Sequence, residues 1–513
     1  MRLRSFTVTS AALALALAGP AAPALAHDPG LDKVVQKNFA VVEATGVGVE
    51  MDKVANLEYT KTGATTQAGS DIEFARIAGR DYAFAGTLRN GMQIVDITSP
   101  TQPVLAAVFD CQISQGDIQV FKQGQRVLAT YTADGSFGAV GAASACGKDL
   151  KLTAAAAGTV LVDVTDPTKP TSVGFASVPR GSHNMTVHPS GNYLYNSNSD
   201  LITSTAPAIV IYDIKNPAKP RFVQEYRIPF VPASLGSESH DITFNASGTR
   251  AYSAALSQTL ILDTTDPEKP KQISQIIDPT VQVVHGADPI TLKTKTGGER
   301  TLLVVSDEQA GAAAGTNCPG GGLHFYDITG TLEKAPAKVA TWFIAEAKPS
   351  TATCTAHVFR MHSEQGLITV AWYDQGVRVL DVAGLADATG GRTNVLRGTQ
   401  GGIKEIGSFV FADSNTWSFK TNAIAKDGSF FGYGNDMGRG FDVYKFDGLG
   451  RTVPALVPTD LAPKSSAKRA ELLPFLPLGG TTLPGLLALS ARVGLAANIT
   501  LVRRAGRART VLA

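Results

Sequence analysis

The chain has 513 residues, of which 44% are apolar, 18% are charged and 7% are aromatic. Its 46 Lys and Arg residues nearly balance its 44 Asp and Glu residues, so bulk charge indicates no polyelectrolyte partner such as nucleic acid. No basic stripe in the sequence suggests a nucleic-acid interface either.

The N-terminus has the pattern of a secretory signal peptide. Two arginines precede an apolar run from Ala11 to Ala18, and Ala24-Leu25-Ala26 forms a small-x-small cleavage site. We therefore predict a signal peptide over residues 1–26 and a mature chain that begins at His27 in an extracytoplasmic, oxidising compartment. A short core helix is the alternative interpretation of the same segment.

Seven copies of one short phrase recur between residues 91 and 448. Each copy alternates β-branched and aromatic residues and then reaches an Asp-Pro, Asn-Pro or Gly turn, which predicts a strand ended by a turn. A supersecondary unit that recurs in this way predicts a repeat array. The copies begin at Gly91, Gly158, Ala208, Thr259, Gly322, Gly376 and Gly440.

The residues around each phrase predict a unit of four strands. The clearest copy begins at His240 and contains four extended segments, with an Asn-Ala-Ser-Gly turn after the first and an Asp-Pro turn after the third. Repeated four-stranded antiparallel units form the blades of a propeller around a central channel. We predict an all-β, seven-bladed propeller over residues 27–450, with a two-sheet sandwich as the alternative. The last blade lacks a fourth strand, which Phe39 to Val47 or Asn56 to Thr60 could supply.

The phrase resembles the strand motif that names the LVIVD-repeat family of bacterial exported propellers. The segment from Val160 to Asp163, Val-Leu-Val-Asp, carries the likeness most clearly, and the resemblance extends over nearly all of the mature chain. It implies the propeller fold and export. It implies no particular activity, because the family has no settled biochemical role and a fold alone does not determine function.

The four cysteines fall into two local sets, Cys111 with Cys146 and Cys318 with Cys354. An exported protein favours disulfide bonds, so we predict one bond within each set. No CxxC spacing supports a thiolate metal site.

Four of the eight histidines recur at one position of the repeat. His183, His240, His285 and His357 each begin the innermost strand of four consecutive blades. Those strands line the channel of a propeller, so the four imidazoles are expected to point toward one mouth of it. Imidazole is the commonest protein metal ligand, which predicts a site for a divalent transition metal such as zinc, copper or iron.

Acidic residues are expected near the same mouth, in loops after the second strands and beside His240. They could complete the coordination sphere or orient the imidazoles through hydrogen bonds. This predicted second shell or loop face consists of Glu238, Asp307, Glu308, Asp374 and Asp436. Two alternatives to a metal site stay open: histidines inherited through duplication for structural hydrogen bonds, and a polar mouth that binds an anion or peptide.

The other histidines are weaker candidates. His188 and His362 fall in hairpins away from the mouth and are predicted to be solvated, whereas His324 is expected to pack inside a third strand. His27 would be the N-terminal residue of the mature chain.

The C-terminus resembles a bacterial sorting signal. A linker and motif region is predicted over residues 451–480, where Leu476 to Gly480 matches an LPxTG pentapeptide except at Gly479. Residues 481–513 form an apolar segment followed by an Arg-rich tail, which is typical of a membrane span with a cytoplasmic end. We expect attachment to the cell envelope, with a secreted protein carrying an unusual tail as the alternative.

Two classes of function follow from the sequence. The first is an envelope-attached binding or scaffold propeller whose loop face recognises a protein, peptide, glycan or small molecule, with a four-His metal site at the channel mouth. The second is a metal-dependent extracytoplasmic oxidase or hydrolase that uses the same histidines. No nucleophile, phosphate-binding or zinc-protease motif is present, and the partners are predicted to include a membrane or cell wall but not nucleic acid.

Overall fold

The computed structural model describes residues 46–463, except 233, 310–317, 319, 346–352, 389–394 and 398–400. The predicted signal peptide, the Leu476 to Gly480 motif and the apolar segment from residue 481 lie outside the described residues. Within them, no helix is long and apolar enough to span a bilayer.

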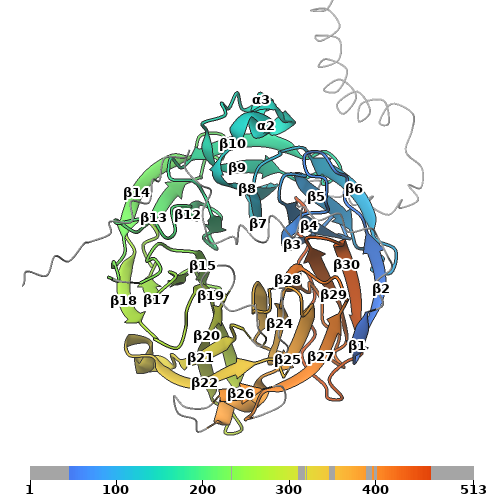
Figure 1. The fold of residues 1–513 in the computed structure, drawn as a ribbon, viewed down its shortest axis with the longest axis vertical. Helices are drawn as coiled ribbons and strands as arrows, with labels where there is room; N and C mark the ends of the chain where they lie inside the picture. The colour runs from blue at the N-terminus through green and yellow to red at the C-terminus, as the bar shows by residue number, and fades with distance from the viewer. Residues whose placement is uncertain are drawn as a thin grey trace, which may run out of the picture. The chain divides into compact units, whose positions relative to one another are not determined.

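The described residues form seven sheets arranged around a ring (Figure 1), and their strands pair antiparallel except for the parallel pair β22 and β26. Each sheet follows the predicted blade pattern, because strands that follow one another in the chain pair side by side from the channel outward. The sheets that form the first four blades consist of β3 Gly69–Ile77, β4 Arg80–Thr87, β5 Met92–Asp96 and β6 Val104–Phe109; β7 Gln115–Gln123, β8 Arg126–Ser136, β9 Ala157–Asp163 and β10 Thr171–Ser177; β11 Asn184–Val187, β12 Tyr193–Ser197, β13 Ala208–Asp213 and β14 Arg221–Arg227; and β15 Asp241–Phe244, β16 Arg250–Ala254, β17 Thr259–Asp263 and β18 Lys271–Ile276.

The remaining three blades take up additional strands from distant parts of the chain. Blades five and six each hold a fifth strand, β26 in blade five and β1 in blade six, and β2 is the fourth strand of blade seven. These sheets consist of β19 Val284–Lys293, β20 Glu299–Asp307, β21 Leu323–Asp327, β22 Ala337–Phe343 and β26 Val395–Arg397; β23 Phe359–His362, β24 Leu367–Ala371, β25 Val377–Asp381, β27 Lys404–Val410 and β1 Val47–Val49; and β28 Thr416–Lys420, β29 Phe430–Asp436, β30 Gly440–Phe446 and β2 Met51–Leu57.

The prediction of a seven-bladed propeller of four-stranded blades is therefore confirmed. The seven repeated phrases form the third strands, β5, β9, β13, β17, β21, β25 and β30. Helix is confined to four short turns among the described residues: α2 Gly138–Ala143, α3 Ala145–Asp149, η2 Gly330–Lys334 and η3 Ala383–Asp387.

The ring closes through the N-terminal strands. β2 pairs antiparallel with β30, from Met51 opposite Phe446 to Leu57 opposite Phe441, and supplies the strand that blade seven lacks. The closing strand thus begins between the two segments expected from the sequence and overlaps the second of them at Asn56 and Leu57. β1 adds to the outer edge of blade six through Val47 opposite Val410, so the N-terminal segment joins two neighbouring blades.

Apolar side chains fill the space between neighbouring blades. β-Branched and aromatic residues of one sheet pack on those of the next, because successive residues of a strand face opposite sides of the sheet. Between blades five and six, for example, Trp342 and Trp372 are fully buried with their rings edge to face at 5.6 Å. The inner strands are thereby fixed around the channel.

A further segment lies along the inner hairpins of several blades, where the inner strands finish. We call residues 451–463 the C-terminal strap. It contacts blade seven through paired hydrogen bonds between Ile424 and Leu456, and blade one through the Asp460 carboxylate, which accepts the N–H groups of Ala78 and Gly79 at 3.0 and 2.8 Å.

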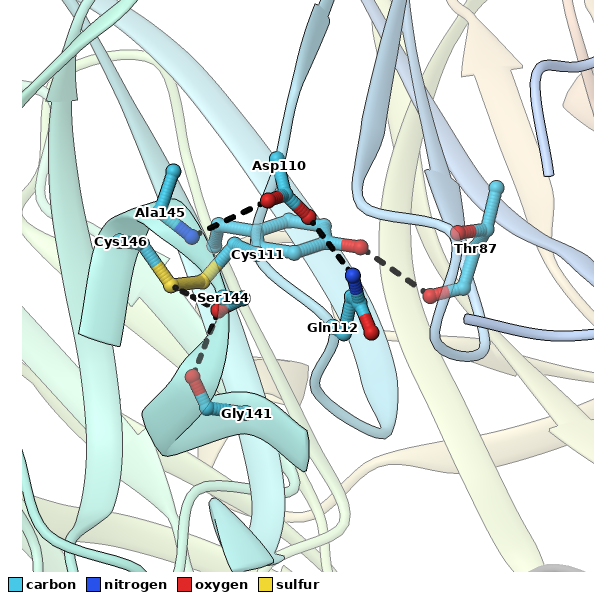
Figure 2. Close-up of a disulfide and its surroundings, with 9 residues drawn as sticks. Thr87, Asp110, Cys111, Gln112, Gly141, Ser144, Ala145 and Cys146 are labelled. Atoms are coloured by element: carbon cyan, nitrogen blue, oxygen red, sulfur yellow. Dashed lines mark hydrogen bonds between the residues drawn. A yellow bond between two sulfur atoms is a disulfide. The ribbon is translucent and has the colours of Figure 1, made fainter. Parts of the chain in front are cut away.

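Both predicted disulfides are present, Cys111–Cys146 and Cys318–Cys354. Figure 2 shows the first, which ties the start of blade two to helix α3. Beside it the Asp110 carboxylate accepts the N–H of Ala145 at 3.1 Å, so the helical insertion is held by a covalent bond and a hydrogen bond together.

Candidate functional site: a histidine arc at the channel mouth

The four inner-strand histidines lie at one end of the channel, as expected. The backbone N–H groups of His183, His240 and His357 bond to second-strand carbonyls at 2.6–3.0 Å, which fixes where each inner strand begins. His285 lies within β19, where the pairing register shifts between Val284 and Gly286. All four side chains are buried.

The four imidazole rings form a continuous arc. Neighbouring ring centroids are 4.2 Å apart for His183 and His240, 4.3 Å for His240 and His285, and 4.3 Å for His285 and His357. The Nε2 atoms of His183 and His240 lie 3.0 Å apart. The ring of blades thus gathers histidines separated by up to 174 positions in the sequence into one arc.

One carboxylate from a second strand faces this arc. Glu308, directly after β20, places Oε2 3.7 Å from Nε2 of His285 and Oε1 3.5 Å from Nε2 of His357. The Tyr373 hydroxyl donates to the same Oε1 at 2.7 Å. Glu308 is 2% exposed, so this contact between a carboxylate and two imidazoles lies out of bulk solvent.

The ligand atoms that lie close enough together to share one metal ion come from fewer histidines than the predicted four. We call these residues the compact group. Ligand atoms of His240, His285 and Glu308 all lie within 4.8 Å of one another. Two ligands on one tetrahedral zinc ion are separated by about 3.3 Å, given Zn–N distances of about 2.0–2.1 Å. Small side-chain movements would bring these three atoms to that spacing, whereas His183 and His357 occupy the two ends of the arc.

The His357 end of the arc is held by a hydrogen bond, and the His183 end lies close to a carboxylate. At one end His357 Nδ1 donates to the Trp417 carbonyl at 2.6 Å, because a carbonyl can only accept, and this leaves Nε2 directed at Glu308. At the other end His183 Nδ1 lies 3.4 Å from the Asp134 carboxylate. A hydrogen bond to one ring nitrogen fixes which nitrogen faces a metal.

Three of the other predicted acidic residues accept hydrogen bonds from backbone N–H groups and do not face the histidine arc. The Asp307 carboxylate accepts the N–H groups of Gln282 and Val283, the Asp436 carboxylate accepts that of Asn415, and the Glu238 carboxylate accepts that of Ala208. Burial raises the pKa of Asp307 and of Asp436 to about 6 and also raises that of Glu238.

Asp374 lies beside the Cys318–Cys354 disulfide. The two sulfur atoms are bonded to each other, so they offer no thiolate to a metal.

The expectation that His188 and His362 are solvated is wrong. Both are buried, because neighbouring blades pack over the inner hairpins. His188 Nε2 lies 2.9 Å from the carbonyl oxygen of Gly248 in the next blade. Burial, with the nearby Arg360 guanidinium, lowers the pKa of His362 to about 3. His324 packs inside β21, as expected, with Nδ1 3.0 Å from the Lys338 ammonium.

Sequence reasoning did not identify several residues that contact the arc. Tyr373, Trp417, Asp134 and Gln115 lie in loops or strand ends where the repeat is least regular. Gln115 Nε2 is 3.5 Å from His183 Nε2. One signal was available for Tyr373, since it directly precedes Asp374, which the sequence had placed at this mouth.

The arc opens into a cavity of about 900 Å³ inside the channel, which His240, His285 and His357 help to line. Charged residues of the inner strands line it as well. On one side Lys420 Nζ donates to Asp71 at 2.7 Å and to Glu73 at 2.8 Å, and the Arg360 guanidinium also donates to Glu73. Burial alone would raise the pKa of Glu73, but the two cations outweigh it and lower the pKa to about 2.

One family model and several solved structures match the chain. A family model described as the LVIVD repeat matches residues 78–111. No curated protein matches the chain significantly.

Solved structures with a similar arrangement include a functionally unknown protein from Desulfotomaculum acetoxidans, 12% identical, which covers 66% of this chain and 92% of its own with a TM-score of 0.41. They also include the periplasmic gluconolactonase of Pseudomonas aeruginosa, 9% identical, which covers 72% of this chain and 96% of its own with a TM-score of 0.45.

Proposed function

We propose that this LVIVD-repeat β-propeller protein is an extracytoplasmic binding protein that holds a divalent transition metal at one mouth of its channel and binds a small polar ligand in the cavity beneath it. The observation that carries the proposal is the cluster of His240, His285 and Glu308, whose ligand atoms lie within 4.8 Å of one another at the head of a cavity of about 900 Å³.

The chemistry of the donor set suits a transition metal. Two imidazoles and one carboxylate are typical ligands of zinc and of non-haem iron, whereas calcium and magnesium prefer oxygen ligands alone. His183 and His357, at the two ends of the arc, extend the set of imidazoles within reach. The buried position of Glu308 also favours a bound cation, because an ionised carboxylate in a site of low dielectric gains from a compensating charge.

An extracytoplasmic location fits the two disulfides. Such bonds form and persist in oxidising compartments and are rare in the cytosol. The predicted signal peptide agrees with this location, and attachment to the envelope through the C-terminal tail is part of the same proposal.

Metal analysis of the purified protein tests the proposal. We expect about one zinc, copper or iron ion per chain after incubation with each metal and removal of excess by gel filtration. His240→Ala and Glu308→Gln should each reduce the bound metal at least tenfold, because each removes one of three ligands. His188→Gln is the matched control, since it alters a buried histidine that bonds to Gly248 rather than to the arc.

Two results would contradict the metal site. One is a wild-type protein that retains no metal under any of these conditions. The other is an equal loss of metal in the His188→Gln control, which would show that general destabilisation explains the loss.

A second candidate function is a metal-dependent oxidase or hydrolase. The observation in its favour is that the compact group supplies three protein ligands, the number found in catalytic zinc sites that keep one position open for water or substrate. Loss of a measured turnover on metal removal, with ligand binding retained, would favour this function over binding alone.

A further inference from the structure

The cavity beneath the histidine arc has an uneven distribution of charge. Its basic side chains among the described residues are Arg250, Arg360 and Lys420, and each is engaged in an ion pair. Arg250 bonds to Glu333 at 2.7 Å, while Arg360 and Lys420 bond to the Asp71 and Glu73 pair.

Three further carboxylates line the cavity: Asp117, Asp241 and Asp288. Their hydrogen bonds come from neutral donors among the described residues. The N–H of Met185 donates to Asp117 at 3.0 Å, the N–H of Ile242 donates to Asp241 at 2.7 Å, and the Thr243 hydroxyl donates to Asp288. The side of the channel formed by β7, β15 and β19 therefore offers carboxylate acceptors that form no ion pair of their own among the described residues. Lys420 and Arg360 act on Asp288 electrostatically but are bonded to Asp71 and Glu73.

This asymmetry is energetically significant because the carboxylates are inside the channel. Burial, together with the charge of Asp71, raises the pKa of Asp117 well above its usual range, and burial also raises that of Asp288. Ionised carboxylates in such a place are unfavourable unless a cation is close by.

The size of the cavity and the neighbouring arc point to a guest molecule rather than to an internal structural network. A volume of about 900 Å³ lies within the range of about 300–1,000 Å³ that small-molecule sites occupy. The cavity also reaches His240 and His285, two of the three residues of the compact group. A molecule held against the carboxylates would thus lie in the same space as a metal at the mouth.

We propose that the ligand of this channel is a small organic cation, whose ammonium group binds between Asp117, Asp241 and Asp288 and whose other end reaches the histidine arc. This inference deepens the proposed function, since the ligand occupies the cavity that the metal would face. The contact between the organic cation and the carboxylates does not require the metal. An experiment can therefore reject the cation site and the metal site independently.

The test compares two probes of equal length that differ in charge. Calorimetric titration of the purified full chain with 1,4-diaminobutane should give binding at least tenfold tighter than with butane-1,4-diol, because only the diamine supplies the missing positive charge. Equal binding of the two probes, or no binding of the diamine, would overturn the inference. Tighter binding of Mg²⁺ or Ca²⁺ than of the diamine would overturn it too, because the site would then be inorganic.

Variants at single carboxylates sharpen the test. Asp288→Asn and Asp117→Asn each keep an acceptor oxygen for Thr243 or for Met185 but remove a charge, so each should weaken diamine binding at least tenfold while the fold is retained. Asp52→Asn, at an exposed position of β2, is the matched control and should bind as the wild type does. Two independent sites keep the test decisive if one variant does not fold.

The titration is run on metal-loaded and on chelator-treated protein. Diamine binding to the chelator-treated form supports the inference even if the metal site fails. A metal-loaded protein that binds metal but not the diamine rejects the inference and leaves the metal site standing.

Discussion

Tyr373 contributes both its backbone conformation and its hydroxyl to the histidine arc. It is fully buried, and its φ of +43° lies in the left-handed region that side-chain-bearing residues rarely adopt. Such strain costs on the order of 1–3 kcal/mol and persists where the surrounding structure imposes it, often at functional sites. Here it directs the phenol to Glu308 and places the ring 4.5 Å from that of His357.

Tyr373→Phe is therefore expected to weaken metal binding without unfolding the protein. The ring and its packing remain, but Glu308 loses the donor that fixes its carboxylate, and loss of such a supporting hydrogen bond costs about 10- to 100-fold in metal affinity. Competition with a chelator measures the affinity. Tyr59→Phe is the control, because it removes a buried hydroxyl that bonds to Asn435. Unchanged affinity in Tyr373→Phe, or the same loss in Tyr59→Phe, would refute the assignment.

The histidines were predictable from the sequence, and Glu308 was among the acidic residues predicted beside them, but which of those carboxylates faces the arc was not. His183, His240, His285 and His357 share one repeat position, and a closed ring must bring that position to one mouth. Asp307 and Glu308 are adjacent, so their side chains diverge: Asp307 accepts backbone N–H groups and Glu308 faces the arc. The directions of these two side chains depend on where β20 ends. The repeat pattern in the sequence does not specify that position.

At the scale of elements, the repeated phrases specify the third strands well because alternation and turn chemistry both act locally. The C-terminal strap was harder to recognise. Its residues, from Arg451 to Pro463, include several prolines and form few regular strand pairs, so they have the composition of a linker. Their order comes from contacts with blades that lie far away in the sequence, such as the Lys122 ammonium, which donates to the Ala462 carbonyl at 2.9 Å.

The strap is expected to stabilise the ring rather than only connect it to the tail. A chain that ends at Gly450 loses the strap, whereas a chain that ends at Pro463 keeps it, and both lack the tail. Several hydrogen bonds at about 0.5–1.5 kcal/mol each, with buried Val453, should lower the unfolding free energy of the shorter chain by about 4 kcal/mol. Urea unfolding followed by tryptophan fluorescence compares the two. Equal unfolding free energies of the two chains would show that the contacts of the strap do not stabilise the ring.

At the scale of the whole molecule, closure of the ring falls at blades six, seven and one. β1 extends blade six, β2 completes blade seven, and the strap crosses from Gln365 of blade six, whose side-chain amide donates to the Pro454 carbonyl at 2.7 Å, to blade one. This region joins the first and last parts of the described chain, residues 46–463, around blades six, seven and one.

His362 lies in this closure region and makes it sensitive to acid. It helps to line a second cavity together with Arg360, Gln365 and Leu456 of the strap. Its Nε2 lies 3.4 Å from the Thr369 hydroxyl, and the Arg360 guanidinium opposes a second positive charge beside it. The folded ring thus holds His362 neutral, with a pKa of about 3 in place of about 6.5.

Because the folded pKa is depressed, the unfolded chain binds the proton more readily between about pH 6.5 and pH 3. Stability from this site is complete above that window and falls as the pH falls through it. His362→Gln keeps a polar group but removes the titration, so the difference in unfolding free energy between wild type and variant should change by about 1.4 kcal/mol per pH unit between about pH 6 and pH 4. Asp436, whose pKa burial raises to about 6, acts in the opposite direction, but it is present in both proteins and cancels from the difference. Urea unfolding at several pH values gives the two curves. If they stay parallel across this range, His362 is protonated equally in the folded and unfolded chains and the closure region has no such acid sensitivity.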